Sequence, residues 1–412
     1  MNKIIRINLD MPLNIDEECI GKEHNQNFIA TQTKENLVYE FNPYNIRNGL
    51  LYPGLKVSDC NWIYRPLPCT FQSSNQENIL IEIINHLLKK IKLKANAWLT
   101  KIISNISIVN KTISIETRME VNYLDSLLND PALSIGEIEG NFLGDYVLKE
   151  ENGVYIFRGN KPNIINDFLV LDEFSKYQDI DIHWGIGTPT SYFEESDSMF
   201  SKEDYLPLFY FVKAGKYITN EVWGGLTKNL STEFLKNPAV IPTSSRVINY
   251  LNYSKKDYKV IMGSNEGIKI NLYYANYEPN SDIAKEISRI SGGILIPTIV
   301  EYSDIVLNLE KLQDGIILNI KSPKHGGLIG HFPELYSLSS IKNENYDKFK
   351  KILHFCVKND IKKIKKEDAV YIEEEINAVC RQFILGRLRP RFRTNMYIPI
   401  TNTGLIKLSH IR

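Results

Sequence analysis

The stretch from Asn141 to Gly187 limits the possible folds more than any other part of this sequence. Two apolar, β-rich runs flank the segment Glu150-Glu151-Asn152-Gly153, and this arrangement predicts a β-hairpin. Further along, residues 179–187 alternate polar and apolar side chains, which is typical of a half-buried strand. That strand ends in glycines and Thr188-Pro189, where the chain must turn. We therefore expect one lobe before this stretch and another after it.

The length and charge of the chain limit its domain organisation and its possible partners. With 412 residues it exceeds what one core usually supports, so two lobes are expected. Its 49 basic residues balance its 49 acidic ones, so the net charge favours neither nucleic acid nor an anionic membrane as a partner. The five cysteines form no CxxC pair, which is typical of free thiols in a reducing compartment.

The N-terminal residues alternate like a strand and contain no apolar signal segment. No window of the sequence approaches the roughly 18 apolar residues that a membrane span needs. The sequence therefore predicts a soluble, cytoplasmic protein. The alternative is an exported protein whose signal is absent from this sequence.

In the second half, predicted strands and helices alternate, which favours βαβ units and a mixed sheet. Residues 14–36, by contrast, are polar and predict an irregular segment. The strands are expected at 206–212, 268–274, 294–301, 315–320 and 396–400, and the helices at 220–230, 281–291, 347–357 and 367–385.

Four segments in order resemble one family of binding proteins. They are Tyr39-Glu40-Phe41 with the following 46–58, Lys111 to Ile115 with Leu124 to Leu128, Gly144 to Leu148 with Phe157 to Asn160, and Asp179 to Ile182. Together they resemble motifs of the extracytoplasmic solute-binding proteins of family 5, which bind dipeptides, oligopeptides or nickel.

The resemblance implies an α/β, two-lobed, periplasmic-binding-protein-like (type II) fold that closes on its ligand at a hinge near residues 185–205. Lobe one would comprise residues 1–190 with a return of about 386–412, where 396–400 would add a strand. Lobe two would comprise residues 191–385.

The resemblance also implies binding rather than catalysis. The ligand would be a peptide, or a peptide-like or anionic small molecule, held between the lobes by a carrier, sensor or accessory protein. One alternative is an exported receptor of an ABC transporter. Another is an enzyme or an assembly subunit that reuses the fold. No cofactor is expected, because no residue spacing predicts a metal or nucleotide site.

Two of the departures from the family pattern concern its ligand-site and GPY motifs. Asp145 stands where the family has a proline. The closest members place an acidic residue about nine positions beyond the equivalent of Asp314, where it holds a peptide's free amine, whereas this chain has Lys321-Ser322-Pro323-Lys324-His325. Capture of a free amine is therefore not expected here.

The candidate ligand-binding residues fall into two groups. Lys321, Lys324 and His325 follow a strand end, where ligands lie in open α/β sheets, and they could hold a carboxylate or phosphate. An exposed basic loop is the alternative. Arg246, which ends the Ser-rich segment 243–246, is a further cationic candidate. The serines of this segment have no base partner that is evident from the sequence, so nucleophilic catalysis is not supported.

The second group is aromatic. His183 and Trp184 end the predicted crossover strand, and Tyr192 and Phe193 follow them. Aromatic side chains at this place could form the near wall of the cleft, opposite the segment 321–325. Core packing at the hinge is the alternative.

A basic stripe near the C-terminus is a candidate protein interface. Arg387, Arg389, Arg391 and Arg393 alternate, which would place all four on one face of an extended segment. A solvated strand edge that pairs with the acidic residues 373–375 is the alternative, and nucleic acid is not favoured on a net-neutral chain.

Overall fold

The fold is described from a computed structural model. It describes residues 3–8, 24–42, 45–67, 76–171, 180–184, 208–231, 233, 235–237, 240, 241, 243, 245–247, 268–277, 279–306, 308–321, 323, 327–340, 343–388, 392, 393, 396 and 406–411. Within these ranges, no helix combines the length and the apolar character needed to cross a membrane.

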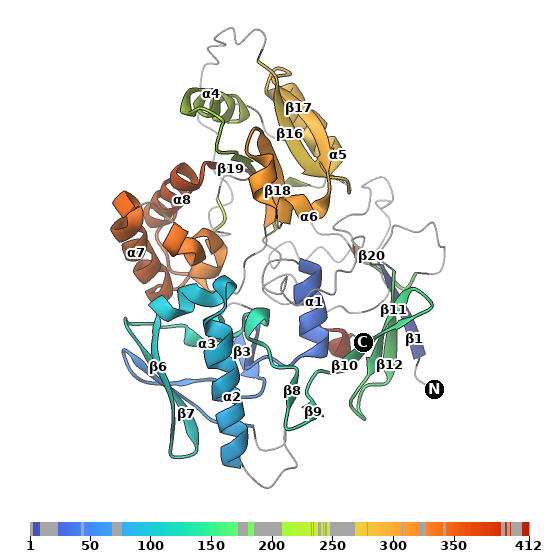
Figure 1. Cartoon of the computed structure of the whole chain (residues 1–412), viewed down its shortest axis with the longest axis vertical. Helices are drawn as coiled ribbons and strands as arrows, with labels where there is room; N and C mark the ends of the chain where they lie inside the picture. Colours follow the sequence, from blue (N-terminus) through green and yellow to red (C-terminus); the bar gives the residue numbers. More distant parts are fainter. Residues whose placement is uncertain are drawn as a thin grey trace.

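A first mixed sheet of six strands contains the N-terminal strand at its centre, in the order β10-β11-β12-β1-β13-β20 (Figure 1). β1 runs parallel to β12 and β13, whereas β10, β11 and β20 are antiparallel to their neighbours. The strands are β1 (Lys3–Asn8), β10 (Tyr146–Glu151), β11 (Val154–Gly159), β12 (Asn166–Leu171), β13 (Ile182–Trp184) and β20 (Phe392–Arg393).

The predicted hairpin is confirmed as the β10–β11 pair, in which Glu151 lies opposite Val154. Asn152 and Gly153 form its turn with φ values of 54° and 76°. Both central residues therefore adopt the positive φ that a type I′ turn requires, which explains why an Asn-Gly pair stands here.

Helix α1 (His24–Thr33) covers the inner face of the first sheet. The ring of Phe28 meets that of Phe157 edge-on at 5.7 Å, and Tyr146 meets Phe168 in the same way. The prediction of an irregular segment at 14–36 is therefore wrong for residues 24–33. The sequence HNQNFIATQT has no clear apolar stripe, so packing on the sheet rather than periodicity stabilises this helix.

The described residues between 38 and 142 form a smaller unit around a four-stranded sheet, β4-β5-β7-β6. Helix α2 (Gln76–Ile91) packs on this sheet, close to the predicted helix, and the lysines of its last turn complement the helix dipole. The other elements are β2 (Val38–Asn42), β3 (Asn45–Asn48), β4 (Leu55–Ser58), β5 (Asn61–Tyr64), η3 (Lys94–Lys101), β6 (Ile103–Val109), β7 (Thr112–Thr117), α3 (Leu124–Leu128), η4 (Pro131–Leu133), β8 (Glu137–Ile138) and β9 (Asn141–Phe142).

A second six-stranded sheet follows in the order β15-β19-β14-β18-β16-β17. It is mixed, as predicted, since β16 is parallel to β17 and β18 while β14 is antiparallel to β18 and β19. The strands are β14 (Phe209–Ala214), β15 (Val240–Ile241), β16 (Ile270–Ala275), β17 (Leu295–Val300), β18 (Ile316–Lys321) and β19 (Gln382–Leu388).

Helices cover both faces of the second sheet. On one face, Tyr210 and Val212 share a core with Leu226 of α4 and Ile283 of α5. On the other face lie Phe209, Phe211 and Ile384, next to the segment that contains α8. The elements are α4 (Asn220–Leu230), α5 (Asn280–Ile290), α6 (Tyr302–Val306), η7 (Leu309–Leu312), η8 (Leu328–His331), η9 (Pro333–Ser340), α7 (Asn343–Lys358) and α8 (Lys366–Cys380).

The end of α8 corrects one prediction. A helix was expected to continue to residue 385, but α8 ends at Cys380, and Gln382 to Leu388 form β19. Arg381 adopts a left-handed conformation with φ 49° and donates from its guanidinium to the carbonyl of Gly215 at 3.1 Å. This contact and the pairing of β19 with β14 outweigh the helical periodicity.

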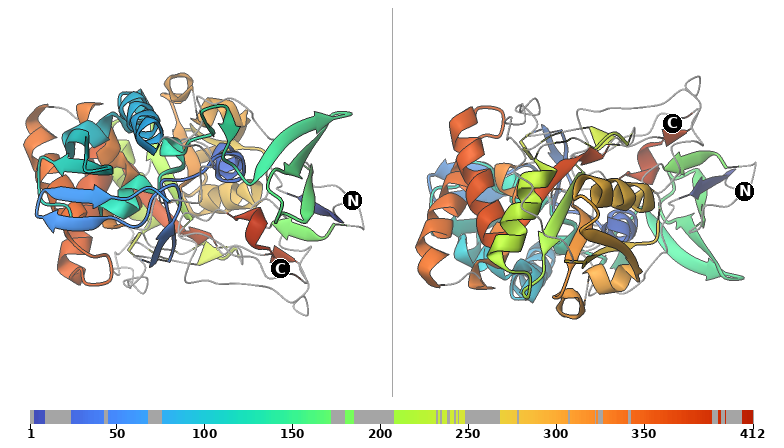
Figure 2. Two further views of the ribbon diagram at one scale, coloured as in Figure 1. Left: turned by 90° about the horizontal axis from the view of Figure 1, so that it is seen from below. Right: turned by 90° about the horizontal axis from the view of Figure 1, so that it is seen from above.

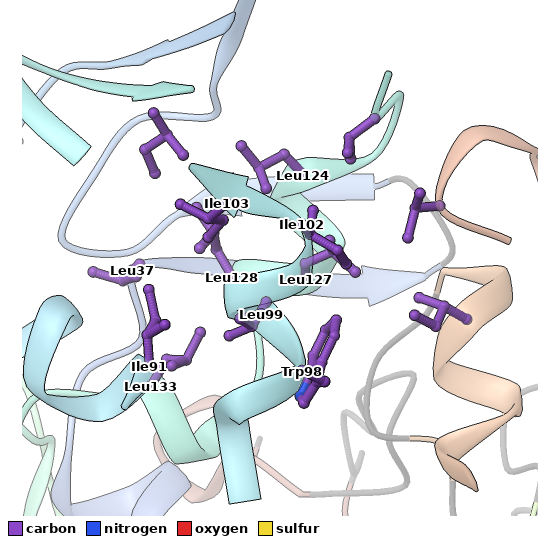
Figure 3. Packing of buried hydrophobic residues seen from close by; sticks show 14 of the residues in the cluster. Leu37, Ile91, Trp98, Leu99, Ile102, Ile103, Leu124, Leu127, Leu128 and Leu133 are labelled. Carbon is purple, nitrogen blue, oxygen red and sulfur yellow. The ribbon is translucent and has the colours of Figure 1, made fainter. Parts of the chain in front are cut away.

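The largest apolar cluster joins the small unit to the helices near α7 and α8. Figure 3 shows its part around Trp98, Leu99, Ile102 and Leu127. The same cluster includes Phe332, Phe349 and Ile372 from the C-terminal third of the chain. Seen from below and above, the small sheet and the first sheet lie toward opposite ends of the molecule, with α1 between them (Figure 2).

The C-terminal segment returns to the first sheet. β20 pairs with β13, and η10 (Leu408–His410) is held against α1, because Gln32 donates to the carbonyl of Ile406 at 2.6 Å. The strand expected at 396–400 lies outside the described residues apart from Met396, which is in a bend. The boundary at 190 and the hinge at 185–205 are also outside them, and the boundary at 385 falls within β19, so the domain division stays a prediction.

The prediction that the four arginines of the basic stripe share one exposed surface is wrong. Arg387 is 4% exposed, because β19 is an inner strand of the second sheet. Arg393 belongs to β20 of the first sheet, so these two residues lie in different sheets. Arg389 and Arg391 are outside the described residues.

Candidate functional site

A small pocket opens on the face of the second sheet that carries Phe209 and Phe211. Its cavity volume is only about 10 Å³, which is room for about one water molecule. Three strands, β14, β18 and β19, provide its floor, and the segments around η8 and η9 provide its wall. Its lining comprises Phe209, Phe211, Arg246, Lys321, Pro323, His331, Pro333, Glu334, Gln382 and Ile384. Two of the candidate residues from the sequence, Arg246 and Lys321, therefore meet here.

Both of these cations bind the same carboxylate. Arg246 Nη1 lies 2.5 Å from Glu334 Oε2, and Lys321 Nζ lies 2.7 Å from Glu334 Oε1. Burial alone would raise the pKa of Glu334, but the charges of Arg246 and Lys321 outweigh it and hold that pKa well below its ordinary value. Glu334 is therefore ionised at neutral pH.

Arg246 is buried and fully engaged. Its Nε lies 3.0 Å from Glu373 Oε1, its Nη2 donates to Asn377 Oδ1 at 3.0 Å, and its backbone N–H donates to Glu373 Oε2. The guanidinium also lies 5.5 Å from the centre of the Phe332 ring. All three nitrogens of the guanidinium are thus engaged, and Arg246 holds the two carboxylates in place at the pocket.

Lys321 is the more accessible of the two, since 39% of its side chain is exposed. Its ammonium group lies 4.9 Å from the centre of the Phe211 ring, over the floor of the pocket. An ammonium group between a carboxylate and an aromatic ring keeps donors for a further acceptor. Lys321 is therefore the cation through which this pocket could hold an anionic group.

His331 supports the wall of the pocket. Burial lowers its pKa to about 4, so the ring is neutral at pH 7. Its Nδ1 lies 3.1 Å from the carbonyl oxygen of Arg246, which accepts the Nδ1 proton. The spacing of His331 and Glu334 is not a metal pattern, and no cluster of three or more metal-ligating side chains occurs among the described residues.

The other candidates from the sequence are not placed in this pocket. His183 and Trp184 lie in β13, opposite Arg393 and Phe392 of β20, and the directions of their side chains are outside the described structure. Tyr192, Phe193, Lys324 and His325 are also outside it. The expectation that Trp184 faces the segment 321–325 across one cleft therefore stays a prediction.

Sequence reasoning missed Glu334 and Glu373 as partners of Arg246. Glu373 was weighed as a partner of the arginine stripe, whereas it pairs with Arg246. Neither pairing has a signal in the sequence, because Arg246 lies far from Glu334 and Glu373 along the chain.

A larger, more open hollow lies on the small four-stranded sheet. Its volume is about 910 Å³, and its lining includes Leu55, Val109, Arg65 and Lys111. No carboxylate is among its described lining residues, so no ionic cluster converges there as it does at Glu334.

No protein-family model matches this chain, and no curated protein matches its sequence. Several solved structures match it over nearly its whole length. The ABC transporter-associated periplasmic binding protein DppA from Helicobacter pylori, in complex with the peptide STSA, is 10% identical with a TM-score of 0.75, covering 99% of this chain and 97% of that one. A periplasmic oligopeptide-binding protein (OppAIV) from Borrelia burgdorferi is 13% identical with a TM-score of 0.75, covering 100% and 99%.

A third structure agrees with these two. The dipeptide-binding protein from Pseudoalteromonas sp. SM9913, in complex with Met-Leu, is 10% identical with a TM-score of 0.74, and both chains are covered completely, at 100%. At such identities the similarity establishes the fold. The two-lobed, periplasmic-binding-protein-like α/β fold predicted from the sequence is therefore confirmed.

Proposed function

We propose that this protein binds a peptide, or a peptide-like anionic small molecule, between its two lobes. The observation that carries the proposal is the match over almost the full length of both chains to three structures named as peptide-binding or in complex with a peptide. The partly exposed Lys321 supports it, because its ammonium group lies over the Phe211 ring and offers a polar donor beside an aromatic surface.

Ligand-induced stabilisation tests this proposal directly. Purified protein would be screened by thermal unfolding against pooled dipeptides to pentapeptides, and native mass spectrometry would look for a ligand that copurifies. A ligand at 100 times its Kd stabilises the native state by about 2.7 kcal/mol, which shifts the melting temperature measurably. Absence of both a copurified ligand and any stabilisation would overturn the proposal.

We further propose that the division into lobes at about residues 190 and 385 allows closure on the ligand. Small-angle scattering with and without a stabilising peptide would show a smaller radius of gyration in the bound state. An unchanged radius would contradict closure but not binding.

The location of the protein separates two possible roles. A carrier or sensor would act in the cytoplasm, whereas a transport receptor would act outside it. The similar proteins from Helicobacter pylori and Borrelia burgdorferi are named as periplasmic, whereas the cytoplasmic location of this chain is a prediction from its sequence. Fractionation of the host cell with an antibody against the protein distinguishes the two roles.

A further inference from the structure

The small four-stranded sheet has a core face and an outer face. Along β5, Trp62 and Tyr64 are buried in the largest apolar cluster. Ile63 and the following Arg65 therefore point to the opposite side, because alternate residues of a strand share a face. Leu55 of the neighbouring β4 lies directly across from Ile63 and is exposed. The outer face of this sheet thus presents apolar side chains to solvent.

The hollow of about 910 Å³ lies on this outer face. One side of its lining is the tip of the β6–β7 hairpin, residues 109–112, and the other side is the segment 52–55. Ile63 and Arg65 lie between these two sides, because β5 separates β4 from β7 in the sheet. The hairpin lies at the margin of the molecule (Figure 1), so the hollow can be reached by a large partner.

The segment 52–55 is held in a fixed position. The backbone N–H of Tyr52 donates to the carbonyl of Arg65 at 2.9 Å, and that of Gly54 donates to Asp125 at 3.0 Å. A Cβ atom on Gly54 would lie 2.5 Å from the ring of Tyr64, so the backbone packs directly on this buried side chain. This side of the hollow is therefore formed before any partner binds.

The opposite side is a tight hairpin turn. Asn110 and Lys111 have φ values of 50° and 58°, the positive values of a type I′ turn. The hydroxyl of Thr112 donates to the carbonyl of Val109 at 2.6 Å and closes the turn. Lys111 is thereby held at the rim of the hollow.

The charges that line the hollow have one sign. Arg65 and Lys111 line it, and neither forms an ion pair with another described residue. Glu116 lies opposite Asn61, at the end of β5 away from Arg65, and Asp59 pairs with a lysine of β4 at 3.4 Å. The chain as a whole has 49 basic and 49 acidic residues, so the positive charge of the hollow is a local feature.

An open hollow of this kind fits a segment of another protein. Tyr52, Leu55 and Val109 are 39%, 61% and 44% exposed, whereas a small-molecule site buries most of its ligand. A second copy bound through a two-fold axis would bring the same cations face to face, where they repel. Exposed apolar side chains beside polar ones are typical of protein interaction sites.

We propose that this hollow is a docking site for an acidic, partly apolar segment of another protein. Carboxylates of the segment pair with Arg65 and Lys111, and its apolar side chains cover Leu55. Complementary charge favours such a partner over neutral or basic ones. The hollow shares no lining residue with the pocket at Lys321, so this site is additional to peptide binding between the lobes.

The test uses three pools of fluorescein-labelled decapeptides with blocked ends. The pools share the same mixed apolar residues and glycines and differ only at their polar positions, which hold Glu, Gln or Lys. The wild-type protein is compared with the double variant Arg65→Glu, Lys111→Glu. The matched control is Lys149→Glu, Lys285→Glu, which changes the net charge equally at exposed positions of β10 and α5.

Fluorescence anisotropy at low salt should show that the wild-type protein binds the Glu pool about 3- to 30-fold more tightly than the Gln pool, as two exposed ion pairs would give. The control variant should keep this order, whereas Arg65→Glu, Lys111→Glu should reverse it and bind the Lys pool most tightly. Leu55→Ser should weaken binding of the Glu and Gln pools by a similar factor, because it removes apolar surface. Melting temperatures would confirm that each variant is folded.

An unchanged order of the pools in the variant Arg65→Glu, Lys111→Glu would overturn the docking site, as would failure of the wild-type protein to bind any pool. A dimer that dissociates in Leu55→Ser, seen by sedimentation velocity, would overturn it in favour of a second copy. Binding of decanoate in place of the Glu pool, lost in the same double variant, would overturn it in favour of an anionic amphiphile. Each of these results leaves peptide binding between the lobes standing.

Discussion

Trp98 and Tyr336 stack face to face, with their ring centroids 4.3 Å apart and their planes 17° from parallel. Trp98 belongs to η3 of the small unit, and Tyr336 belongs to η9 beside the pocket wall. Both rings are part of the largest apolar cluster. The stack therefore joins residues predicted for lobe one to residues predicted for lobe two, and it connects the wall that carries Glu334 to a rigid core.

Trp98→Ala should lower the free energy of unfolding by about 3–5 kcal/mol, because it removes a large buried side chain and leaves a cavity between the two segments. Trp98 is 2% exposed, whereas Tyr217 is 70% exposed. Tyr217→Ala, as a control, should change stability by less than about 0.5 kcal/mol. Urea denaturation followed by circular dichroism measures both, and equal effects would contradict the stated role of the stack.

Arg246→Met should lower the free energy of unfolding by about 3–5 kcal/mol, because Glu334 and Glu373 would stay buried without the cation that compensates their charge. The matched control is Arg289→Met, since Arg289 pairs with Glu233 at the surface and is largely exposed. Exposed pairs contribute about 0–1 kcal/mol. Similar melting temperatures for the two variants would show that the buried pair is not needed.

Asp145→Asn should destabilise the attachment of the C-terminal segment. Asp145 lies 3.1 Å from the ammonium group of the buried Lys407 and accepts from Lys161 and Ser409 at 2.6 Å each. Lys407 would lose its counter-charge, although it would still donate to the carbonyl of Thr31. We expect a loss of about 3 kcal/mol at pH 7.

The effect of Asp145→Asn should depend on pH in a defined direction. Burial raises the pKa of Asp145, but Lys407 and Lys161 outweigh it and hold the pKa below its ordinary value of 3.8. An acid with a lowered folded-state pKa stabilises the protein above its unfolded-state pKa, and this contribution disappears as the pH falls through the folded-state value. The difference between wild type and variant should therefore shrink below about pH 4. A constant difference in urea titrations at pH 7 and pH 3 would contradict this.

Asp125→Asn should stabilise the protein at pH 8. Burial raises the pKa of Asp125 to about 6, although the N–H of Gly54, which donates to it at 3.0 Å, partly offsets that rise. An acid with a raised folded-state pKa destabilises the native state above that pKa and not below its unfolded-state pKa. The gain should be at most about 3 kcal/mol at pH 8 and should vanish near pH 4, since one pKa unit corresponds to about 1.4 kcal/mol.

That gain is measurable as the midpoint of urea unfolding at the two pH values. The asparagine side chain of this variant would keep an oxygen to accept from the N–H of Gly54, so packing is preserved. A variant less stable than wild type at pH 8 would show that the ionised carboxylate is stabilising there, against the direction given above.

Local features were the part of the fold that the sequence predicted well. The hairpin at Asn152-Gly153 depends on backbone conformations that these two residues adopt easily, so it could be predicted without tertiary contacts. Helix α5 ends one residue before Ser291, and Gly292 and Gly293 both have positive φ, as their sequence position indicated. The order of degenerate motifs was enough to predict the two-lobed fold.

Only the tertiary structure decided which charges meet and which segments become strands. Arg246, Lys321 and Glu334 lie far apart in the sequence, and a Coulomb interaction depends on distance and burial, which composition and spacing do not contain. Residues 382–385 were expected to continue a helix, yet β14 supplies Gln382 to Leu388 with backbone partners and they form a strand. The stretch from residue 141 to 187 thus predicted the β10–β11 hairpin, whereas long-range packing determined the pocket.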